Sequence, residues 1–312
     1  MKYIQEMREG DNISQVLLCK MKQALRTRAG KTYYSLQLQD KTGLLDGKIW
    51  DLSSGIDYFD TMDYIHVDGQ IVVFQGAPQL NVYRVRMAQE GEYDPADYMP
   101  VSEKNIGDMK VLLGKYVASV KEPNLNRLLK AFFDDEAFMK VFAAHSAAKS
   151  VHHSFLGGLI EHTLNVTRNA DYMARYYPFL KRDLLITAAL LHDVGKVREL
   201  SVMPENDYTD EGNLLGHIYM GAEMIHDKVL QIPGFPEILE EQLKHCILAH
   251  HGEYEFGSPK HPEIAEAMAL HMADNLDAKM ETFYEMLKNA DEHETWLGYQ
   301  KLFDAPIRKT TM

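Results

Sequence analysis

Residue types that bind metal ions recur through the C-terminal half of this 312-residue chain, and they constrain its fold more than any other feature. Each lies in a stretch whose apolar residues repeat with helical spacing. Histidines and carboxylates that converge from several helices hold divalent ions within reach of water. The set consists of His162, His192, Asp193, His217, His250, His251 and Asp274. The sequence therefore predicts helices gathered around a metal centre.

The spacing of apolar residues places several of these metal-type residues on the inward, apolar faces of the expected helices. In the stretch 236–251, His250 shares a face with Leu243, and in 263–290 Asp274 lies on the apolar face. A carboxylate buried without a partner costs several kcal/mol or becomes protonated, and a metal ion removes that cost. A single inward histidine is more often a hydrogen-bonded core residue. Ligand types on the inward faces of several helices together indicate a metal site, and paired ions hydrolyse phosphate esters.

The first 92 residues have a different pattern. Short stretches of partly alternating apolar residues, separated by turn residues, predict β strands. We expect strands over 16–21, 33–39, 44–50, 65–74 and 79–87. Short strands packed this densely suggest a small barrel, for which an OB-fold is the economical choice.

The predicted fold class is multidomain, with a small all-β OB-fold barrel followed by an all-α metal-binding domain. We expect the barrel in 1–92, a linker in 93–105, a helical connector in 106–150 and the metal-binding domain in 151–312. Pro95 and Pro100 mark the linker. Helices are expected over 106–120, 125–133, 136–144, 155–177, 183–197, 213–230, 236–251 and 263–290.

The amino-acid composition indicates a cytoplasmic protein and is compatible with a nucleic-acid partner. The two cysteines fall in different expected domains, and no apolar run suggests a signal peptide or a membrane span. We therefore expect a cytoplasmic protein without a membrane partner. The net charge of -13 is uneven, because residues 1–92 carry 11 basic against 12 acidic side chains. The acidic surplus lies in the expected metal-binding part, where bound cations would offset some of it.

The order of the metal-type residues carries a family resemblance. The chain resembles the HD superfamily of metal-dependent phosphohydrolases. The resemblance lies in His162, in the pair His192-Asp193 followed by Gly195 and Lys196, and in Asp274. His217 and His250 resemble additions found in the two-metal branch of that superfamily. The barrel, the connector and the stretches 38–43, 150–163 and 250–259 are similar to the bacterial YhaM family of 3′–5′ exoribonucleases.

The resemblance implies roles for these residues. One ion would be held by His162, His192, Asp193 and Asp274, and a second by His217 and His250, with Asp193 shared. His251 fits either a further ligand or a residue that supports one. Asp193 and Lys196 are the expected catalytic residues, Lys196 through a contact to a substrate phosphate. The family favours Mn²⁺, and other divalent transition ions also suit histidine-rich ligands.

The activity implied is 3′–5′ hydrolysis of single-stranded RNA to nucleoside 5′-monophosphates, in RNA turnover. Two divalent ions would acidify the attacking water, and they would stabilise charge on the phosphate together with Lys196. Single-stranded DNA fits the same chemistry. A homo-oligomer is compatible with the sequence.

Basic and aromatic residues of the expected barrel suggest where a single strand binds. No acidic residue occurs between positions 20 and 31, which form one strand and the loop after it. The alternative is a solvated cationic loop beside ordinary strand tyrosines, and strand register decides whether Tyr33 or Tyr34 faces outward. His152 and His153 fit a substrate contact and a structural role equally well. The predicted substrate-binding residues are Lys20, Lys22, Arg26, Arg28, Lys31, Tyr33, Arg84, Arg86 and His153.

Three other functions remain as alternatives. An HD-type phosphodiesterase for cyclic dinucleotides usually carries Gly-Tyr-Pro, whereas this chain has Gly257-Ser258-Pro259, and an OB domain is not its usual partner. An HD-type nucleotide phosphohydrolase would leave the basic barrel loop unexplained. An RNA-binding protein with a non-catalytic HD centre is disfavoured, because the set of ligand types is complete.

Overall fold

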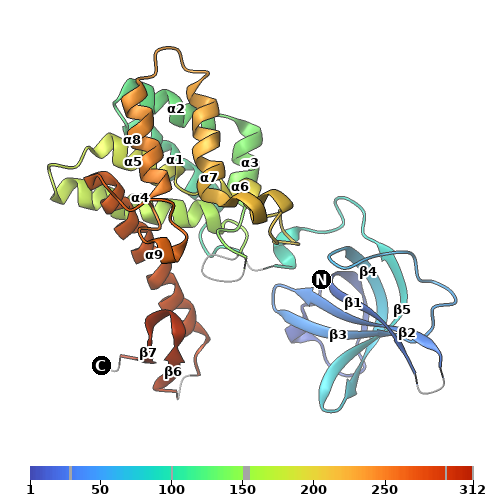
Figure 1. Cartoon of the computed structure of the whole chain (residues 1–312). Helices are drawn as coiled ribbons and strands as arrows, with labels where there is room; N and C mark the ends of the chain where they lie inside the picture. The colour runs from blue at the N-terminus through green and yellow to red at the C-terminus, as the bar shows by residue number, and fades with distance from the viewer. Residues whose placement is uncertain (28–29, 100, 150–154, 292–293, 311–312) are drawn as a thin grey trace. The chain divides into compact units, whose positions relative to one another are not determined.

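The computed structural model describes residues 1–312 except 28–29, 100, 150–154, 292–293 and 311–312. The chain forms two compact units, Met1–Val101 and Ser102–Met312, and each is considered by itself (Figure 1). Among the described residues, no helix has both the length and the apolarity needed to cross a bilayer.

The first unit is a closed five-stranded barrel. Its strands are β1 (Asn12–Arg26), β2 (Thr32–Asp40), β3 (Gly43–Ile49), β4 (Tyr64–Phe74) and β5 (Ala77–Met87). They close in the order β1-β2-β3-β5-β4, and every neighbouring pair is antiparallel except β3 with β5. A small five-stranded barrel with this crossover is an OB-fold, which confirms the predicted fold of the N-terminal unit.

β1 closes the barrel because it is long enough to pair with two strands. Its first half pairs with β4 and its second half with β2, and the two pairings overlap at Leu18, just before a bulge between Cys19 and Met21 in the pairing with β2. A bulge bends a strand and increases its twist, which allows one strand to serve both edges. The sequence predicted only residues 16–21, since residues 20–26 extend past the core and are mostly exposed, without apolar alternation.

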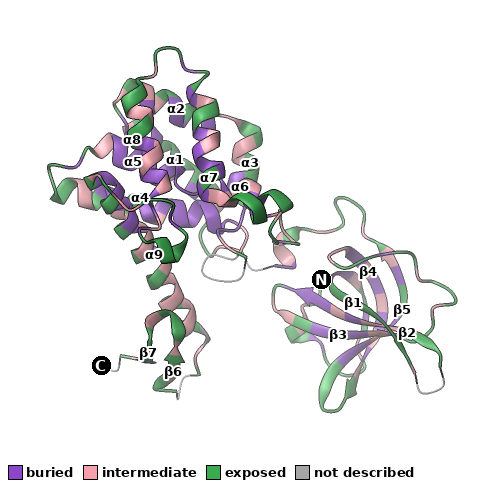
Figure 2. Ribbon diagram, in the orientation of Figure 1, coloured by how far each residue is buried: buried purple, intermediate pink, exposed green. Residues whose placement is uncertain are grey.

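Buried residues, coloured purple in Figure 2, recur along the barrel strands and form the core of the barrel. Leu17, Leu38, Ile65 and Leu80 are each fully buried. The segment expected as a linker packs partly on the barrel, because the Gln39 side chain donates a hydrogen bond to the Tyr98 carbonyl at 2.9 Å. Tyr98 is only 2% exposed.

The second unit is helical over most of its length. Its first helices are α1 (Ile106–Ser119), α2 (Pro123–Phe133), α3 (Glu136–Ala144) and α4 (Gly158–Tyr176). The later ones are α5 (Arg182–Leu191), α6 (Lys196–Glu199), α7 (Asp210–Val229), α8 (Glu237–Leu248) and α9 (Ala265–Asn289). The expected helix 183–197 is therefore two helices separated by a turn at His192–Gly195.

Helix α5 forms the centre of this unit. Every residue from Leu184 to Leu191 is buried, and the helix contacts α2, α4, α8 and α9. A helix that is apolar on all sides is stable only when other helices surround it. α5 therefore supports α4, α8 and α9, which carry or precede predicted metal ligands, while α7 packs on α2, α6 and α8.

A small hairpin follows α9, and the sequence analysis did not anticipate it. β6 (Trp296–Gln300) and β7 (Ala305–Arg308) pair antiparallel around the short helix η4 (Lys301–Phe303). The Phe303 ring lies against Phe283 of α9, with ring centroids 4.3 Å apart. Strands of this length carry too few residues to show a periodicity.

Neighbouring leucines of β3 provide a test of the barrel. Leu45 is 2% exposed and Leu44 is 52% exposed, because they lie on opposite faces of the strand. We expect Leu45→Ala to lower the free energy of unfolding of the barrel by about 2–5 kcal/mol. Leu44→Ala should change it by less than about 0.5 kcal/mol. Urea unfolding, followed by Trp50 fluorescence in a Trp296→Phe background, measures both; equal effects would contradict the register.

Candidate functional site

The predicted metal-type residues come together from five parts of the helical unit. His162 lies on α4, His217 on α7 and Asp274 on α9, whereas the two adjacent pairs lie in the turns that follow α5 and α8. The sequence predicted that His192-Asp193 and His250-His251 lie within helices, whereas the structure places both pairs in turns. Consecutive residues of a helix do not face the same way. In a turn, both His192 and Asp193 can point to one centre.

Asp193 lies between two groups of imidazoles. Its Oδ2 is 3.4 Å from His162 Nε2 and 3.3 Å from His192 Nε2. Its Oδ1 is 3.5 Å from His217 Nε2 and 3.7 Å from His250 Nε2. The two oxygens of one carboxylate thus face different pairs of histidines.

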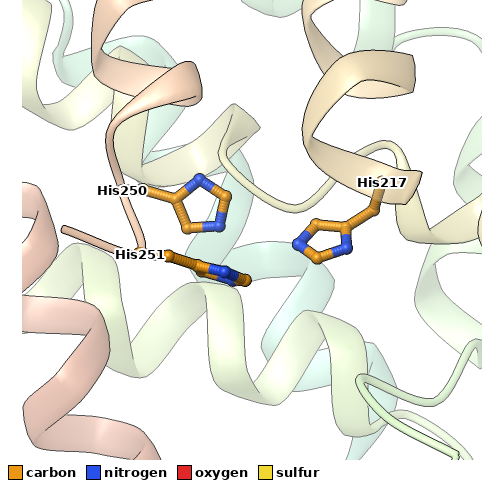
Figure 3. Close-up of side chains that lie close together, drawn as sticks. All are labelled: His217, His250 and His251. Carbon is orange, nitrogen blue, oxygen red and sulfur yellow. The ribbon is translucent and has the colours of Figure 1, made fainter. Parts of the chain in front are cut away.

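The remaining predicted ligands extend the two groups. Asp274 Oδ1 lies 3.2 Å from His162 Nε2 and 3.9 Å from His192 Nε2. Figure 3 shows His251 beside His250, both facing His217 across the site. A ligand atom from each of these three histidines lies within 4.8 Å of the others. Two clusters that could hold a divalent ion therefore adjoin at Asp193.

Hydrogen bonds fix which nitrogen of each ring carries the proton. The Nδ1–H groups of His192 and His250 donate to the carbonyls of Ala189 and Ile247 at 2.8 and 2.6 Å. A carbonyl only accepts, so the proton must be on Nδ1 and the lone pair on Nε2. His251 Nδ1 is held in the same way by the Phe256 carbonyl at 2.8 Å. The atoms turned toward Asp193 are thus acceptors.

Two carboxylates that the sequence analysis missed hold the other rings. Asp277 Oδ2 lies 2.7 Å from His162 Nδ1, and Glu199 Oε1 lies 2.8 Å from His217 Nδ1. Asp277 follows Asp274 by one helical turn, a spacing that could have revealed it. The spacing of Glu199 gave no such signal, because Glu199 and His217 come together only through the path of the chain between α6 and α7.

Glu199 also orients the backbone before His217. α7 is interrupted at Gly216, whose φ of 73° is left-handed, and helical geometry resumes at His217. Glu199 Oε1 accepts from the His217 amide at 2.9 Å as well as from its ring. One carboxylate therefore caps the second part of the helix and turns its first side chain toward Asp193.

Burial leaves several polar atoms of the site without partners. Within the described residues, Asp193 Oδ1, His217 Nε2 and His250 Nε2 are buried and accept no hydrogen bond. Buried polar atoms are normally paired, so an unpartnered cluster needs an explanation. A bound cation would supply the missing partner to all three acceptors.

The electrostatics of the site favour a charged Asp193 carboxylate, whereas the histidines around it differ in charge. Burial alone would raise the pKa of Asp193, but Lys196 and the neighbouring histidines hold it well below its usual range. Burial lowers the pKa of His250 well below its usual range, aided by His251 and His192. Burial also opposes charge on His162, yet its aspartate neighbours raise the pKa well above the usual range.

Lys196 lies beside Asp193. Its Nζ is 2.7 Å from Asp193 Oδ2, and its side chain is 14% exposed. Burial would lower its pKa, but Asp193 raises it, so the amine stays protonated. Lys196, Asp193 and Asp274 line a cavity of about 330 Å³ that opens beside the imidazoles.

The predicted cations of the barrel differ in how free they are. Lys20 and Arg26 are exposed, and so are Lys31 and Arg84, which lie 3.5 Å from Asp51 and 4.0 Å from Asp68. Lys22 donates to the Phe59 carbonyl at 2.5 Å. Arg86 holds the Glu92 carboxylate through both terminal nitrogens at 2.7 and 2.9 Å. Arg28 and His153, with His152, lie outside the described residues.

The two tyrosines between which the sequence did not decide have different surroundings. Tyr34 packs against the barrel core and meets Phe59 edge-on. Tyr33 stacks on Trp50, with ring centroids 4.6 Å apart, and Trp50 is 44% exposed. Trp50 was not among the predicted residues, although an exposed tryptophan after a short strand is a usable signal.

Comparison with known proteins identifies the family. Residues 159–279 match the HD domain family, which covers the predicted ligands from His162 to Asp274. The chain is 34% identical over 290 residues to the 3′–5′ exoribonuclease YhaM of Listeria innocua serovar 6a, covering 91% of both proteins. The chain belongs to the YhaM family of 3′–5′ exoribonucleases. This assignment confirms the sequence-based family prediction and the predicted order of an OB-fold barrel and a helical HD domain.

Two solved structures resemble part of the chain at low similarity. The second OB-fold domain of replication protein A from Methanococcus maripaludis matches 29% of this chain and 98% of its own, with 18% identity and a TM-score of 0.24. A replication protein A heterotrimer bound to single-stranded DNA matches 28% of this chain and 64% of its own, with 17% identity and a TM-score of 0.22. The OB-fold assignment rests on the strand order of the barrel.

Gly195 provides a test of how the site is assembled. A Cβ atom there would lie 2.1 Å from the His217 carbonyl oxygen and 2.7 Å from the Gly221 amide nitrogen. We expect Gly195→Ala to displace this part of α7, lower the free energy of unfolding by about 1–3 kcal/mol or more, and weaken metal binding. Calorimetric titration with Mn²⁺ and urea unfolding measure the two effects.

The matched control is Gly114→Ala on α1, where an added Cβ meets nothing within 4 Å. It should leave metal binding unchanged and stabilise the helix by about 0.5–1 kcal/mol. Unchanged metal affinity in the Gly195 variant would show that α7 does not depend on this close approach.

Proposed function

We propose that this protein is a metal-dependent 3′–5′ exoribonuclease that hydrolyses single-stranded RNA to nucleoside 5′-monophosphates, in RNA turnover. The observation that carries the proposal is the Asp193 carboxylate, whose two oxygens face separate pairs of imidazole acceptors. Membership in the YhaM family supports the direction and the substrate.

The donor set fits two divalent ions. Two ligands bound about 2.0–2.2 Å from one ion lie roughly 3–3.5 Å apart at tetrahedral or octahedral angles. The distances from His162 Nε2 to Asp193 Oδ2 and Asp274 Oδ1, 3.4 and 3.2 Å, agree with this. His162 Nε2 and His192 Nε2 lie 3.2 Å apart, a close approach that a shared cation would stabilise.

We assign the first ion to His162, His192, Asp193 and Asp274, and the second to His217, His250 and Asp193, with His251 as a further ligand or a support. When bound, such an ion pair supplies an acidified water and neutralises developing charge on the phosphate. Mn²⁺ is the proposed ion, because mixed imidazole and carboxylate ligands suit borderline divalent metals.

The remaining residues bind and orient. Lys196 is held as an ammonium by Asp193 at the cavity wall, where it can bind a phosphate oxygen of the substrate. Asp277 and Glu199 hold the rings of His162 and His217 from behind, which keeps their Nε2 atoms directed at the ions.

On the barrel we propose a binding surface for single-stranded RNA, with single-stranded DNA as a second candidate. Lys20, Arg26 and Lys31 would contact phosphates, and the stacked pair Tyr33 and Trp50 would offer a face to a base. Arg84 is exposed and has only a 4.0 Å contact with Asp68, while Arg86 would first have to leave Glu92. Arg28 and His153 stay predictions.

We also propose a cytoplasmic location, since both Cys19 and Cys246 are buried free thiols, as a reducing compartment allows. The predicted homo-oligomer stays a prediction. Hydrolysis of cyclic dinucleotides is the rival reaction, and Gly257-Ser258-Pro259 departs from the element expected for it.

Asp193→Asn tests the metal centre and the activity together. We expect Mn²⁺ and wild-type protein to shorten 5′-end-labelled single-stranded RNA progressively from its 3′ end. The variant should be at least about 100-fold slower, because even losing a support of a metal ligand costs 10- to 100-fold. Gel electrophoresis measures the ladder, and elemental analysis measures the bound metal.

Asp227→Asn is the control, since Asp227 is an exposed carboxylate of α7 away from the site, and it should cleave normally. Intact RNA that still binds the wild-type protein would reject the exonuclease and direct attention to cyclic dinucleotides.

Arg26→Ala tests the barrel as the RNA-binding surface. In an Asp193→Asn background, we expect weaker binding of single-stranded RNA and a salt dependence reduced by about 0.7 in the slope of log K against log salt. Fluorescence anisotropy at several salt concentrations measures the slope. Arg86→Ala, whose guanidinium is already paired with Glu92, should have a smaller effect. An unchanged slope for Arg26→Ala would remove this residue from the surface.

A further inference from the structure

The cavity beside the metal-type residues also has a wall that the metal chemistry does not use. It is formed by Phe256, His271, Asn275, Ala278, Lys279 and Leu302. The cavity volume of about 330 Å³ is at the lower end of the range for ligand pockets, roughly 300–1,000 Å³. A space of this size suits one nucleotide rather than a longer piece of a strand.

Packing within the described residues does not explain the position of the Phe256 side chain. Its side chain is part of the cavity wall, and the residue is 62% exposed. It contacts no aromatic ring among the described residues and lies outside the hydrophobic core of the helical unit. Tyr254, two residues earlier, is also 62% exposed, but it packs on His261 and does not line the cavity.

The segment that carries Phe256 is tied to the metal centre. The Phe256 carbonyl accepts the hydrogen bond from His251 Nδ1 at 2.8 Å. The buried Ser258 hydroxyl lies 2.7 Å from the Lys260 carbonyl and 3.1 Å from the Leu248 carbonyl at the end of α8, and it can donate to either. Gly257 turns the chain between them with a φ of 79°, which favours glycine. The backbone that carries the ring is thereby held close to His250 and His251.

We propose that Phe256 forms a stacking platform for the base of the 3′-terminal nucleotide, and that Lys279 binds a phosphate of the same nucleotide. This inference rests on the proposed function. An aromatic ring accepts any base, so the platform would give affinity for a nucleotide without sequence preference. Lys279 is exposed at the cavity, and the described residues give it no ion pair.

Binding of adenosine 5′-monophosphate and of ribose 5-phosphate to the Mn²⁺-loaded protein tests the platform. Wild type should bind the nucleotide roughly 5- to 150-fold more tightly, the ratio that corresponds to about 1–3 kcal/mol for one stacked base. Phe256→Ala should bring this ratio close to one, while Phe256→Trp should retain it. Tyr254→Ala is the matched control and should leave the ratio unchanged. Isothermal calorimetry measures all of these affinities.

Lys279→Ala should weaken both ligands to the same extent, because each carries one phosphate. Lys301→Ala, an exposed lysine that does not line the cavity, should weaken neither. Equal affinity of wild type for the two ligands, or an equal loss for both in Phe256→Ala, would overturn the platform; unchanged affinities in Lys279→Ala would overturn the phosphate contact.

RNA substrates separate this inference from the proposed function. The KM for an RNA ending in an abasic residue should exceed that for a normal end in wild type, and Phe256→Ala should remove the difference. If wild type binds the nucleotide selectively through Phe256 but degrades no RNA, the exonuclease proposal fails and the subsite stands. If RNA is degraded with no selectivity lost in Phe256→Ala, the subsite fails and the exonuclease stands.

Discussion

A negative charge buried among imidazoles dominates the helical unit. Asp193 is 2% exposed, and the nearest imidazole nitrogens approach both of its oxygens. Such a charge is stable in a protein interior only when cations or donors surround it. Lys196 provides one cation, and the proposed metal ions provide the others. The elements that converge here must therefore be positioned accurately, and α5, buried from Leu184 to Leu191, packs against α4, α8 and α9 among them.

The hydrogen bonds behind the imidazoles decide what the site can bind. Carbonyls of the chain hold His192 and His250, while Asp277 and Glu199 hold His162 and His217. Each bond directs the opposite nitrogen of the ring toward Asp193 as an acceptor. The arrangement is suited to a cation and unsuited to a purely apolar ligand. His251 is held in the same way by the carbonyl of Phe256, whose side chain is the proposed base platform.

The sequence indicated which residues could bind a metal ion, but it did not predict all the helix boundaries beside them. The inward phase of Asp274 and His250 was readable from the apolar spacing around them. The break after Leu191 was not, because an apolar run looks the same whether a helix continues or turns. Glu199 was missed because it faces His217 only after the chain has reversed, and the terminal hairpin was missed because its strands are too short for a pattern.

The sequence by itself determined the barrel strands, the helical second half, the family and the set of residues able to bind metal. Those properties follow from periodicity and from residue type, which are local. Only the tertiary structure decided that Asp193 lies between two histidine groups, that Tyr33 stacks on Trp50 while Tyr34 enters the core, and that Phe256 borders the metal centre. Each of these depends on strand register, on turns or on contacts between distant segments, and a one-residue shift in any of them redirects the side chain.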